Sequence, residues 1–213
     1  MQPQPLERNR HVYKNEAFAE LVKDVVRFFN GTPVHSLPPP ESFFGTGVYA
    51  LYYTGSYPLY QRYAVLNRLS YTFPIYVGKA VPKGWRQGRL SHNALNQSRE
   101  LIGRLREHSR SIALGANLSL NDFMCRFVIF EGEGSDMIGT IEAALIKLNK
   151  PLWNTVVDGF GNHDPGNGRY QQAKSAWDVI HEGRAWANKC DGLHIEKNVI
   201  ISNIKLHLDN LGN

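Results

Sequence analysis

The sequence predicts an α+β fold with a small, mainly antiparallel sheet of three strands flanked by helices. Runs rich in β-branched and aromatic residues, which are typical of strands, occupy residues 46–53, 73–78 and 123–130. Apolar residues recur at helical spacing over residues 98–114 and 136–149. Glycine and proline separate these runs. Residues 43–154 therefore predict the order strand, strand, helix, strand, helix.

Additions surround this predicted core. They comprise an N-terminal arm and helix within 1–42, insertions at about 54–72 and 79–97, and a C-terminal extension at 155–213. The N-terminal helix spans 15–30, with Asn15 as its cap and Gly31 as its end, and a proline-rich connector follows. The extension begins with a glycine-rich loop and contains a helix near 175–189. We expect a single domain in which the extension packs on the core.

The composition is that of an ordinary globular protein. The 213 residues are 42% hydrophobic and 20% charged, and no run of apolar residues is long enough for a membrane span. The N-terminus has the pattern of neither a secretory signal nor a transit peptide. Cys125 and Cys190 are too few for a disulfide scaffold or a four-cysteine zinc site. We expect a soluble, cytoplasmic protein with two structural cysteines.

The positive charge is concentrated in one segment. The chain has a net charge of +5, and the stretch from Lys79 to Arg110 alone carries eight basic residues against two acidic ones. The basic residues there are Lys79, Lys83, Arg86, Arg89, Arg99, Arg104, Arg106 and Arg110. Such a segment is consistent with a surface that contacts a phosphate backbone and also with a solvated basic helix.

Polar side chains lie on the apolar faces of both predicted core helices. A rotation of about 100° per residue places His108 inside the stripe of the first helix and Arg104 at its margin. The arginine indicates either a cleft or a buried ion pair, and the histidine either chemistry or a core position. Glu142 lies at the border of the second stripe, and Asn154 follows that helix. Taken alone, these two residues are also consistent with a helix-dipole partner and a turn residue.

In chain order these residues form one pattern. It consists of Gly47-Val48-Tyr49, Tyr76-Val77-Gly78, Arg104 with His108, Glu142, and Asn154. The pattern resembles the GIY-YIG nuclease superfamily, whose signature strands, arginine-bearing helix, metal-binding glutamate and terminal asparagine follow in this order. Valine replaces isoleucine in both triplets, and the signature tyrosines are 27 residues apart, so the first strand pair carries an insertion. The additions are similar to those of the Type II restriction endonucleases in the superfamily.

The resemblance implies a role for each catalytic candidate. Tyr49 is the general base, although a phenol with a pKa near 10 needs help to act at neutral pH, and His108 receives or relays the proton. Tyr76 positions the attacking water or this relay, and Asn154 orients neighbouring groups. Arg104 clamps phosphate oxygens. Glu142 binds one Mg²⁺, for which Mn²⁺ is an expected substitute.

We also predict roles for other residues near this pattern. The implied DNA contacts are Lys79, Lys83, Arg86, Arg89, Arg99, Arg106 and Arg110, and the candidate base-reading side chains are Arg86, Arg89, Arg169 and Arg184. We expect Tyr52 and Tyr53 to serve packing rather than chemistry. Gly47 and Gly78 are expected to leave room for a ligand backbone. His163 and Asp164 precede Pro165-Gly166, which favours a turn over a metal site.

The implied function is a site-specific, Mg²⁺-dependent endonuclease of the restriction type, acting on double-stranded DNA in a bacterial cytoplasm. Symmetric cleavage of a palindrome is most simply done by a homodimer, and a restriction role implies a cognate DNA methyltransferase in the host. Two alternatives remain. One is a homing or repair nuclease of relaxed specificity, and the other is a nucleic-acid binding module without catalysis. Metal-dependent cleavage distinguishes them.

Overall fold

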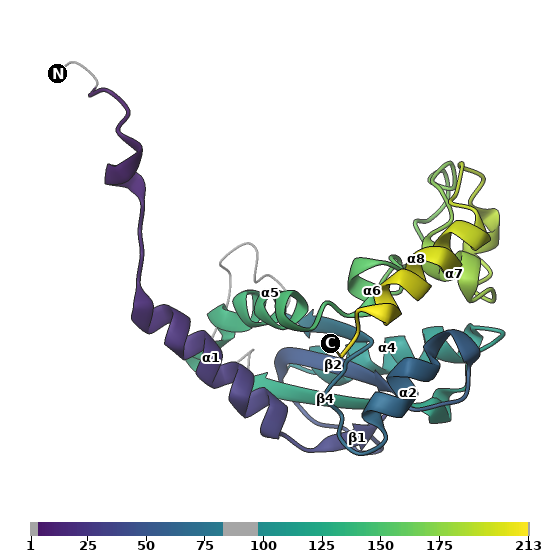
Figure 1. Cartoon of the computed structure of the whole chain (residues 1–213), viewed down its shortest axis with the longest axis horizontal. Coiled ribbons are helices and arrows are strands. Elements are labelled where there is room, and N and C mark those ends of the chain that lie inside the picture. The colour runs from purple at the N-terminus through teal and green to yellow at the C-terminus, as the bar shows by residue number, and fades with distance from the viewer. Residues whose placement is uncertain (1–3, 83–97, 213) are drawn as a thin grey trace.

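The computed structural model describes residues 4–82 and 98–212 and contains an α+β fold built on one antiparallel sheet (Figure 1). The strands are β1 (Val34–Ser36), β2 (Thr46–Tyr53), β3 (Tyr76–Ala80) and β4 (Phe123–Phe130). Their order is β1-β4-β2-β3, and every neighbouring pair is antiparallel. The catalytic candidates on β3 therefore lie at an edge of the sheet.

The predicted α+β class is confirmed, and the sheet has one strand more than the expected three. Strand β1 has only three residues and pairs with β4, with Val34 opposite Arg126. Strands β2 and β4 have the predicted bounds, whereas β3 begins three residues later than the predicted 73–78. Pro74 lies in that difference, and proline cannot donate a ladder hydrogen bond.

Helices cover both faces of the sheet. The α-helices of the described residues are α1 (Glu16–Gly31), α2 (Gln61–Asn67), α4 (Glu100–Leu114), α5 (Ile138–Asn149), α6 (Leu152–Thr155), α7 (Ala176–Ile180) and α8 (Lys197–Asp209). Helices α4 and α5 both pack against β2 and β3, and α1 packs against α5 and β4. Among these residues, no helix is long and apolar enough to cross a membrane.

Strand β2 is buried along its whole length because both of its faces are covered. Tyr49, Leu51 and Tyr53 belong to one hydrophobic cluster, together with apolar residues of α4. Ala50 and Tyr52 belong to the opposite cluster, together with apolar residues of α5. Packing for Tyr52 and Tyr53 is as expected. Tyr49 is buried as well, so exposure does not distinguish it from them.

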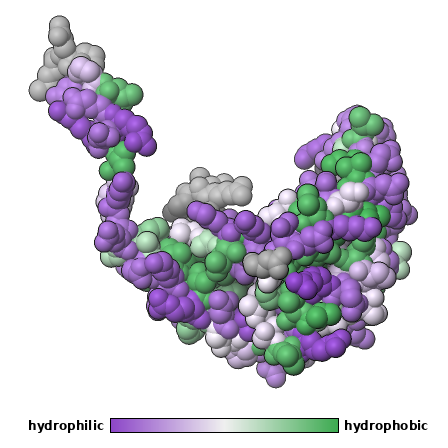
Figure 2. All heavy atoms as spheres, viewed as in Figure 1, coloured by the Kyte–Doolittle hydropathy of each residue, from purple (hydrophilic) through white to green (hydrophobic). Residues whose placement is uncertain are grey.

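The N-terminal helix forms as predicted. The Asn15 side chain accepts a hydrogen bond from the backbone N–H of Phe18, and Gly31 is the last helical residue. The arm before α1 runs away from the core in Figure 1 and is mainly hydrophilic in Figure 2. This arm is exposed from residue 4 up to the start of the helix.

The C-terminal extension packs on the same core. Ile200 and Ile204 of α8, a segment for which the sequence pattern favours no element, share the cluster that contains Tyr49. The helix predicted near 175–189 is shorter, consisting of α7 and a 3₁₀ turn at Ala187–Lys189. The apolar side chains of the extension therefore complete the face of the sheet on which α4 lies.

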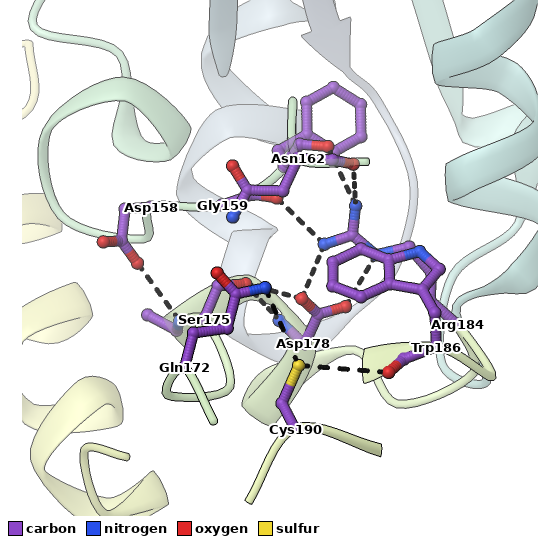
Figure 3. Close-up of polar contacts among 11 residues, drawn as sticks. Asp158, Gly159, Asn162, Gln172, Ser175, Asp178, Arg184, Trp186 and Cys190 are labelled. Carbon is purple, nitrogen blue, oxygen red and sulfur yellow. Dashed lines mark hydrogen bonds and ion pairs between the residues drawn. The ribbon is translucent and has the colours of Figure 1, made fainter. Parts of the chain in front are cut away.

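A buried arginine holds the loop at the start of this extension (Figure 3). Arg184 makes two hydrogen bonds to the carboxylate of Asp178, at 2.6 and 2.7 Å. It also donates to the backbone carbonyls of Gly159, Phe160 and Asn162. The guanidinium lies over the rings of Trp177 and Trp186. The guanidinium is thus occupied by hydrogen bonds within the protein, so the expectation that Arg184 reads bases is wrong.

Candidate active site

The catalytic candidates converge at the edge strand β3 from both faces of the sheet. Tyr49 and Tyr76 project toward α4, which carries Arg104 and His108. Glu142 belongs to α5, on the opposite face, yet its charge acts on both tyrosines. An edge strand permits this arrangement because side chains from the two faces can meet beyond its open side. The result is a polar site that neither helix forms alone.

Tyr49 and His108 form a short, buried hydrogen bond. The Tyr49 hydroxyl lies 2.5 Å from His108 Nε2, and the two residues are 0% and 2% exposed. Burial, reinforced by the charge of Arg104, lowers the pKa of His108 to about 3, so the imidazole is neutral. Burial also raises the pKa of Tyr49 well above 10. Both groups are therefore neutral, and the phenol donates to Nε2 in the tautomer in which His108 carries its proton on Nδ1.

The glycines of the two signature strands make room for protein atoms. Gly78 lies opposite Tyr49 in the β2–β3 register, and a Cβ there would be 2.5 Å from the Tyr49 hydroxyl oxygen. A Cβ on Gly47 would be 1.9 Å from the carbonyl oxygen of Val128. The expectation that these glycines accommodate a ligand backbone is thus corrected. Gly78 instead permits Tyr49 to lie across β3.

Aromatic rings enclose His108. The Phe160 ring stacks on the imidazole, with centroids 4.6 Å apart and planes at 20°, and Tyr76 meets His108 edge-on at 5.2 Å. Burial raises the pKa of Tyr76, against the charge of Arg104. Phe160 is not among the residues that the sequence pattern predicts for the site. Its signal in the sequence is that of a lone large apolar residue in a glycine-rich loop. This enclosure fixes the plane of the imidazole.

Arg104 combines both interpretations that the sequence leaves open. Its Nη1 atom lies 2.7 Å from Glu107 Oε2, so the charge is paired with a carboxylate on the same helix. The same atom donates to His163 Nε2, also at 2.7 Å. The side chain remains 29% exposed, and its charge opposes the raised pKa values of Tyr49 and Tyr76. Arg104 is thus oriented by two neighbours and still reaches solvent.

The loop that follows α6 contributes more than a turn. Asp164 accepts hydrogen bonds from the Gly166 N–H and the Tyr170 hydroxyl, as a turn residue does. His163, in contrast, contacts Arg104, a contact that the turn pattern of this loop does not indicate. A cavity of about 330 Å³ lies between this loop and α4, and His108, Glu107 and His163 border it. The cavity brings solvent close to the buried imidazole.

Glu142 forms an ion pair with Lys79 of β3. The Lys79 Nζ atom lies 2.5 Å from Glu142 Oε2, although the sequence suggests a phosphate contact for this lysine. Within residues 4–82 and 98–212 no group of three or more His, Cys, Asp and Glu side chains gathers as a metal cluster. A single carboxylate still fits Mg²⁺, which keeps several waters and takes further oxygen ligands from a substrate phosphate. Glu142 is the residue at the site that could hold it.

Asn154 pairs with the open edge of β3. Its Oδ1 accepts from the Val77 N–H and its Nδ2 donates to the Val77 carbonyl, both at 2.8 Å. The amide side chain therefore replaces a neighbouring strand at the residue between Tyr76 and Gly78. A turn or cap residue would not make these contacts. Asn154 orients the signature strand.

The remaining basic candidates are distributed unevenly. Arg99 and Arg110 are exposed, Arg106 is partly buried, and Arg169 is exposed on the loop of the extension. Lys83, Arg86 and Arg89 lie outside the described residues. Arg99 lies over the ring of Phe44, at 5.0 Å from its centroid. Arg99 and Arg110 thus lie on solvent-exposed parts of α4 and its start.

Comparison with known proteins agrees with this geometry. No curated protein matches the chain. The family model described as the Eco29kI GIY-YIG domain matches residues 41–208, which is well over half of the 213 residues and includes every catalytic candidate. The order of elements, the tyrosines of the paired strands and the Arg104, His108 and Glu142 side chains all lie within the match. The protein belongs to the Eco29kI GIY-YIG family of Type II restriction endonucleases.

Proposed function

We propose that this nuclease cuts both strands of double-stranded DNA at a palindromic site, in a Mg²⁺-dependent reaction that leaves 5′-phosphate and 3′-hydroxyl ends. The observation that carries the proposal is the arrangement around β3, with the Tyr49–His108 pair and Arg104 on one face and Glu142, paired with Lys79 of β3, on the other. Together they supply a proton acceptor, a phosphate clamp and a metal-binding carboxylate. Hydrolysis of a phosphodiester requires these three elements.

Proton removal runs from water through Tyr49 to His108. A neutral phenol with a raised pKa is a poor base alone. In the tautomer in which His108 Nε2 is the acceptor, Tyr49 can take the proton of an attacking water while it passes its own to the imidazole. A phosphate bound to Arg104 neutralises a charge that holds the His108 pKa down. Substrate binding therefore makes His108 a better acceptor.

Arg104 binds the scissile phosphate. Its guanidinium is planar, keeps its charge and is oriented by Glu107 and His163 before DNA arrives. Tyr49 is buried, so its hydroxyl has to become accessible to the attacking water before it can act as the base. Glu142 holds Mg²⁺, with Mn²⁺ as a substitute, and the bound ion supplies stabilisation of negative charge on the phosphate and the leaving oxygen. Asn154 keeps Tyr76 in place beside the reacting water.

DNA contacts and assembly follow from the same proposal. Exposed Arg99 and Arg110 contact the backbone, with Lys83, Arg86 and Arg89 in the adjoining segment. Each chain contributes one site, so a homodimer with a two-fold axis cuts both strands of a palindrome. The hydrophilic arm and α1 are candidates for partner or DNA contacts. The host is a bacterium that protects its own DNA with a cognate methyltransferase, and the nuclease acts in its cytoplasm.

The test is cleavage of plasmids of known sequence with Mg²⁺ or with EDTA. Discrete Mg²⁺-dependent fragments are expected, and mapping their ends yields the recognition sequence. We expect Glu142→Ala to lower the cleavage rate by at least about a hundredfold while DNA binding persists. The matched control is Glu133→Ala, which removes an exposed carboxylate just before α5. A metal-dependent smear would favour a nuclease of relaxed specificity, and retarded but intact plasmid would favour a binding module.

A further inference from the structure

Lys79 and Glu142 neutralise one another in the DNA-free chain. Their side chains are 32% and 19% exposed, and Nζ lies 2.5 Å from Oε2. In the part of the chain that the structure describes, no other hydrogen bond or ion pair reaches either charged group. A partly buried charge is costly to leave without a counter-charge. Each side chain therefore provides the counter-charge for the other.

This pairing opposes metal binding at the carboxylate. A divalent cation at Glu142, whether it binds Oε1 or Oε2, would lie close to the Lys79 ammonium and place two positive groups side by side. Repulsion between charges at such short range is strong, and partial burial reduces the screening by water and salt. The lysine must therefore leave before a metal can bind well.

A DNA phosphate is the anion to which Lys79 can move. Lysine carries a compact charge on a flexible four-carbon stem, so its Nζ can change partners without movement of the strand. Lys79 directly follows Gly78 on the strand that carries Tyr76. Lys79 lies on the α5 face with Glu142, whose charge acts on the same two tyrosines as that of Arg104. We therefore expect a phosphate that Arg104 binds at this edge to come within reach of the lysine's flexible stem. Once the ammonium binds that phosphate, Glu142 has lost its counter-charge.

We infer that Lys79 acts as a counter-ion lock on Glu142. Without DNA the lysine holds the carboxylate and keeps metal affinity low, and a DNA phosphate takes the ammonium and frees Glu142 for Mg²⁺. Metal and DNA then strengthen each other's binding by the same factor. The inference rests on the proposed function, because it requires Glu142 to be the metal ligand and DNA to be the substrate. In this inference, DNA binding promotes metal binding at Glu142.

The test measures Mn²⁺ affinity directly, by the electron paramagnetic resonance signal of free Mn²⁺ in titrations of the full chain. Lys79→Met removes the charge and nearly keeps the length of the side chain, and Lys147→Met is the matched control on the exposed side of α5. In the absence of DNA, Lys79→Met is expected to bind Mn²⁺ about tenfold more tightly than wild type, a typical coupling between sites. Lys147→Met should stay within about twofold.

Addition of a duplex that carries the mapped cleavage site tests the role of DNA. In a Tyr49→Phe background, which prevents cleavage, the duplex should raise Mn²⁺ affinity by a larger factor when Lys79 is present than when Lys79→Met has been added. Circular dichroism checks folding, and Lys79→Gln is the second variant. Unchanged or weaker Mn²⁺ binding by both Lys79 variants would overturn the lock and leave the nuclease intact. If Glu142→Gln leaves Mn²⁺ affinity unchanged even with DNA, the metal assignment in the proposed function fails instead.

Discussion

Within residues 4–82 and 98–212, two fully buried tyrosine–histidine pairs are nearly identical in their central contact. The hydroxyl of Tyr49 lies 2.5 Å from His108 Nε2, and the hydroxyl of Tyr60 lies 2.5 Å from His181 Nε2. Burial lowers the pKa of each histidine to about 3 and raises the pKa of each tyrosine well above 10. Only the first pair lies at the edge of β3. The pair geometry alone therefore does not identify a site.

The two pairs differ at their outer ends. Tyr60 also accepts a hydrogen bond from Trp153 Nε1, and His181 Nδ1 donates to Asn117 Oδ1 at 2.6 Å, so that pair is closed on both sides. In the described residues no hydrogen-bond partner faces His108 Nδ1, and a cavity borders this ring. The charge of Arg104 acts on both members of the open pair. A proton can enter and leave such a pair, whereas the closed pair only holds the fold together.

The largest expected effect comes from removing one hydroxyl from each pair. Tyr49→Phe should lower the cleavage rate by about 10²–10⁴, the usual contribution of a general base, and leave DNA binding largely intact. Tyr60→Phe should keep cleavage within about threefold and lower the free energy of unfolding by about 1–3 kcal/mol, because Trp153 and His181 lose a partner. Single-turnover cleavage and urea unfolding separate the two. Equal losses of cleavage would contradict the distinction.

The same contrast between open and closed groups extends to two arginines. Arg184→Gln should lower the free energy of unfolding by about 3–5 kcal/mol, because it leaves Asp178 buried without its partner. Arg104 is partly exposed, so Arg104→Gln should cost at most about 1 kcal/mol. Urea titrations measure both changes, with cleavage assayed under conditions where each variant is folded. A stable Arg184→Gln variant would show that the loop of the extension does not depend on this arginine.

Sequence patterns predicted the elements and site residues that depend on local periodicity and chain order. Tyr49 and Arg104 lie on a strand and a helix whose apolar stripes are long enough to recognise. Strand β1 has three residues and is too short for a pattern. Phe160 and His163 reach the site because Arg184 holds their loop. The burial of a charged residue such as Arg184 depends on tertiary contacts that the local sequence does not indicate. The Lys79–Glu142 pair likewise depends on how α5 packs on β3.

The smallest effect is the dependence of stability on pH that the two histidines share. Each has a native pKa of about 3, against about 6.5 when unfolded, so both are neutral in the two states above pH 6.5 and stability is complete there. As pH falls from 6.5 toward 3, the unfolded chain binds protons that the native chain does not. Stability then falls by about 1.4 kcal/mol per pH unit for each histidine.

Replacement of one histidine by asparagine should remove its share of this slope. His181→Asn should reduce the slope between about pH 6 and pH 4.5 by about 1 kcal/mol per pH unit, measured by urea unfolding against wild type. His108→Asn should reduce it by a similar amount, because burial lowers the pKa of both histidines to about 3. The carboxylates contribute equally in all three proteins and cancel. A clearly smaller reduction for His108→Asn would show that the adjacent cavity lets water stabilise the protonated imidazole, which would sharpen the difference between the two pairs. A slope that neither substitution changes would mean that the fold does not hold these histidines neutral.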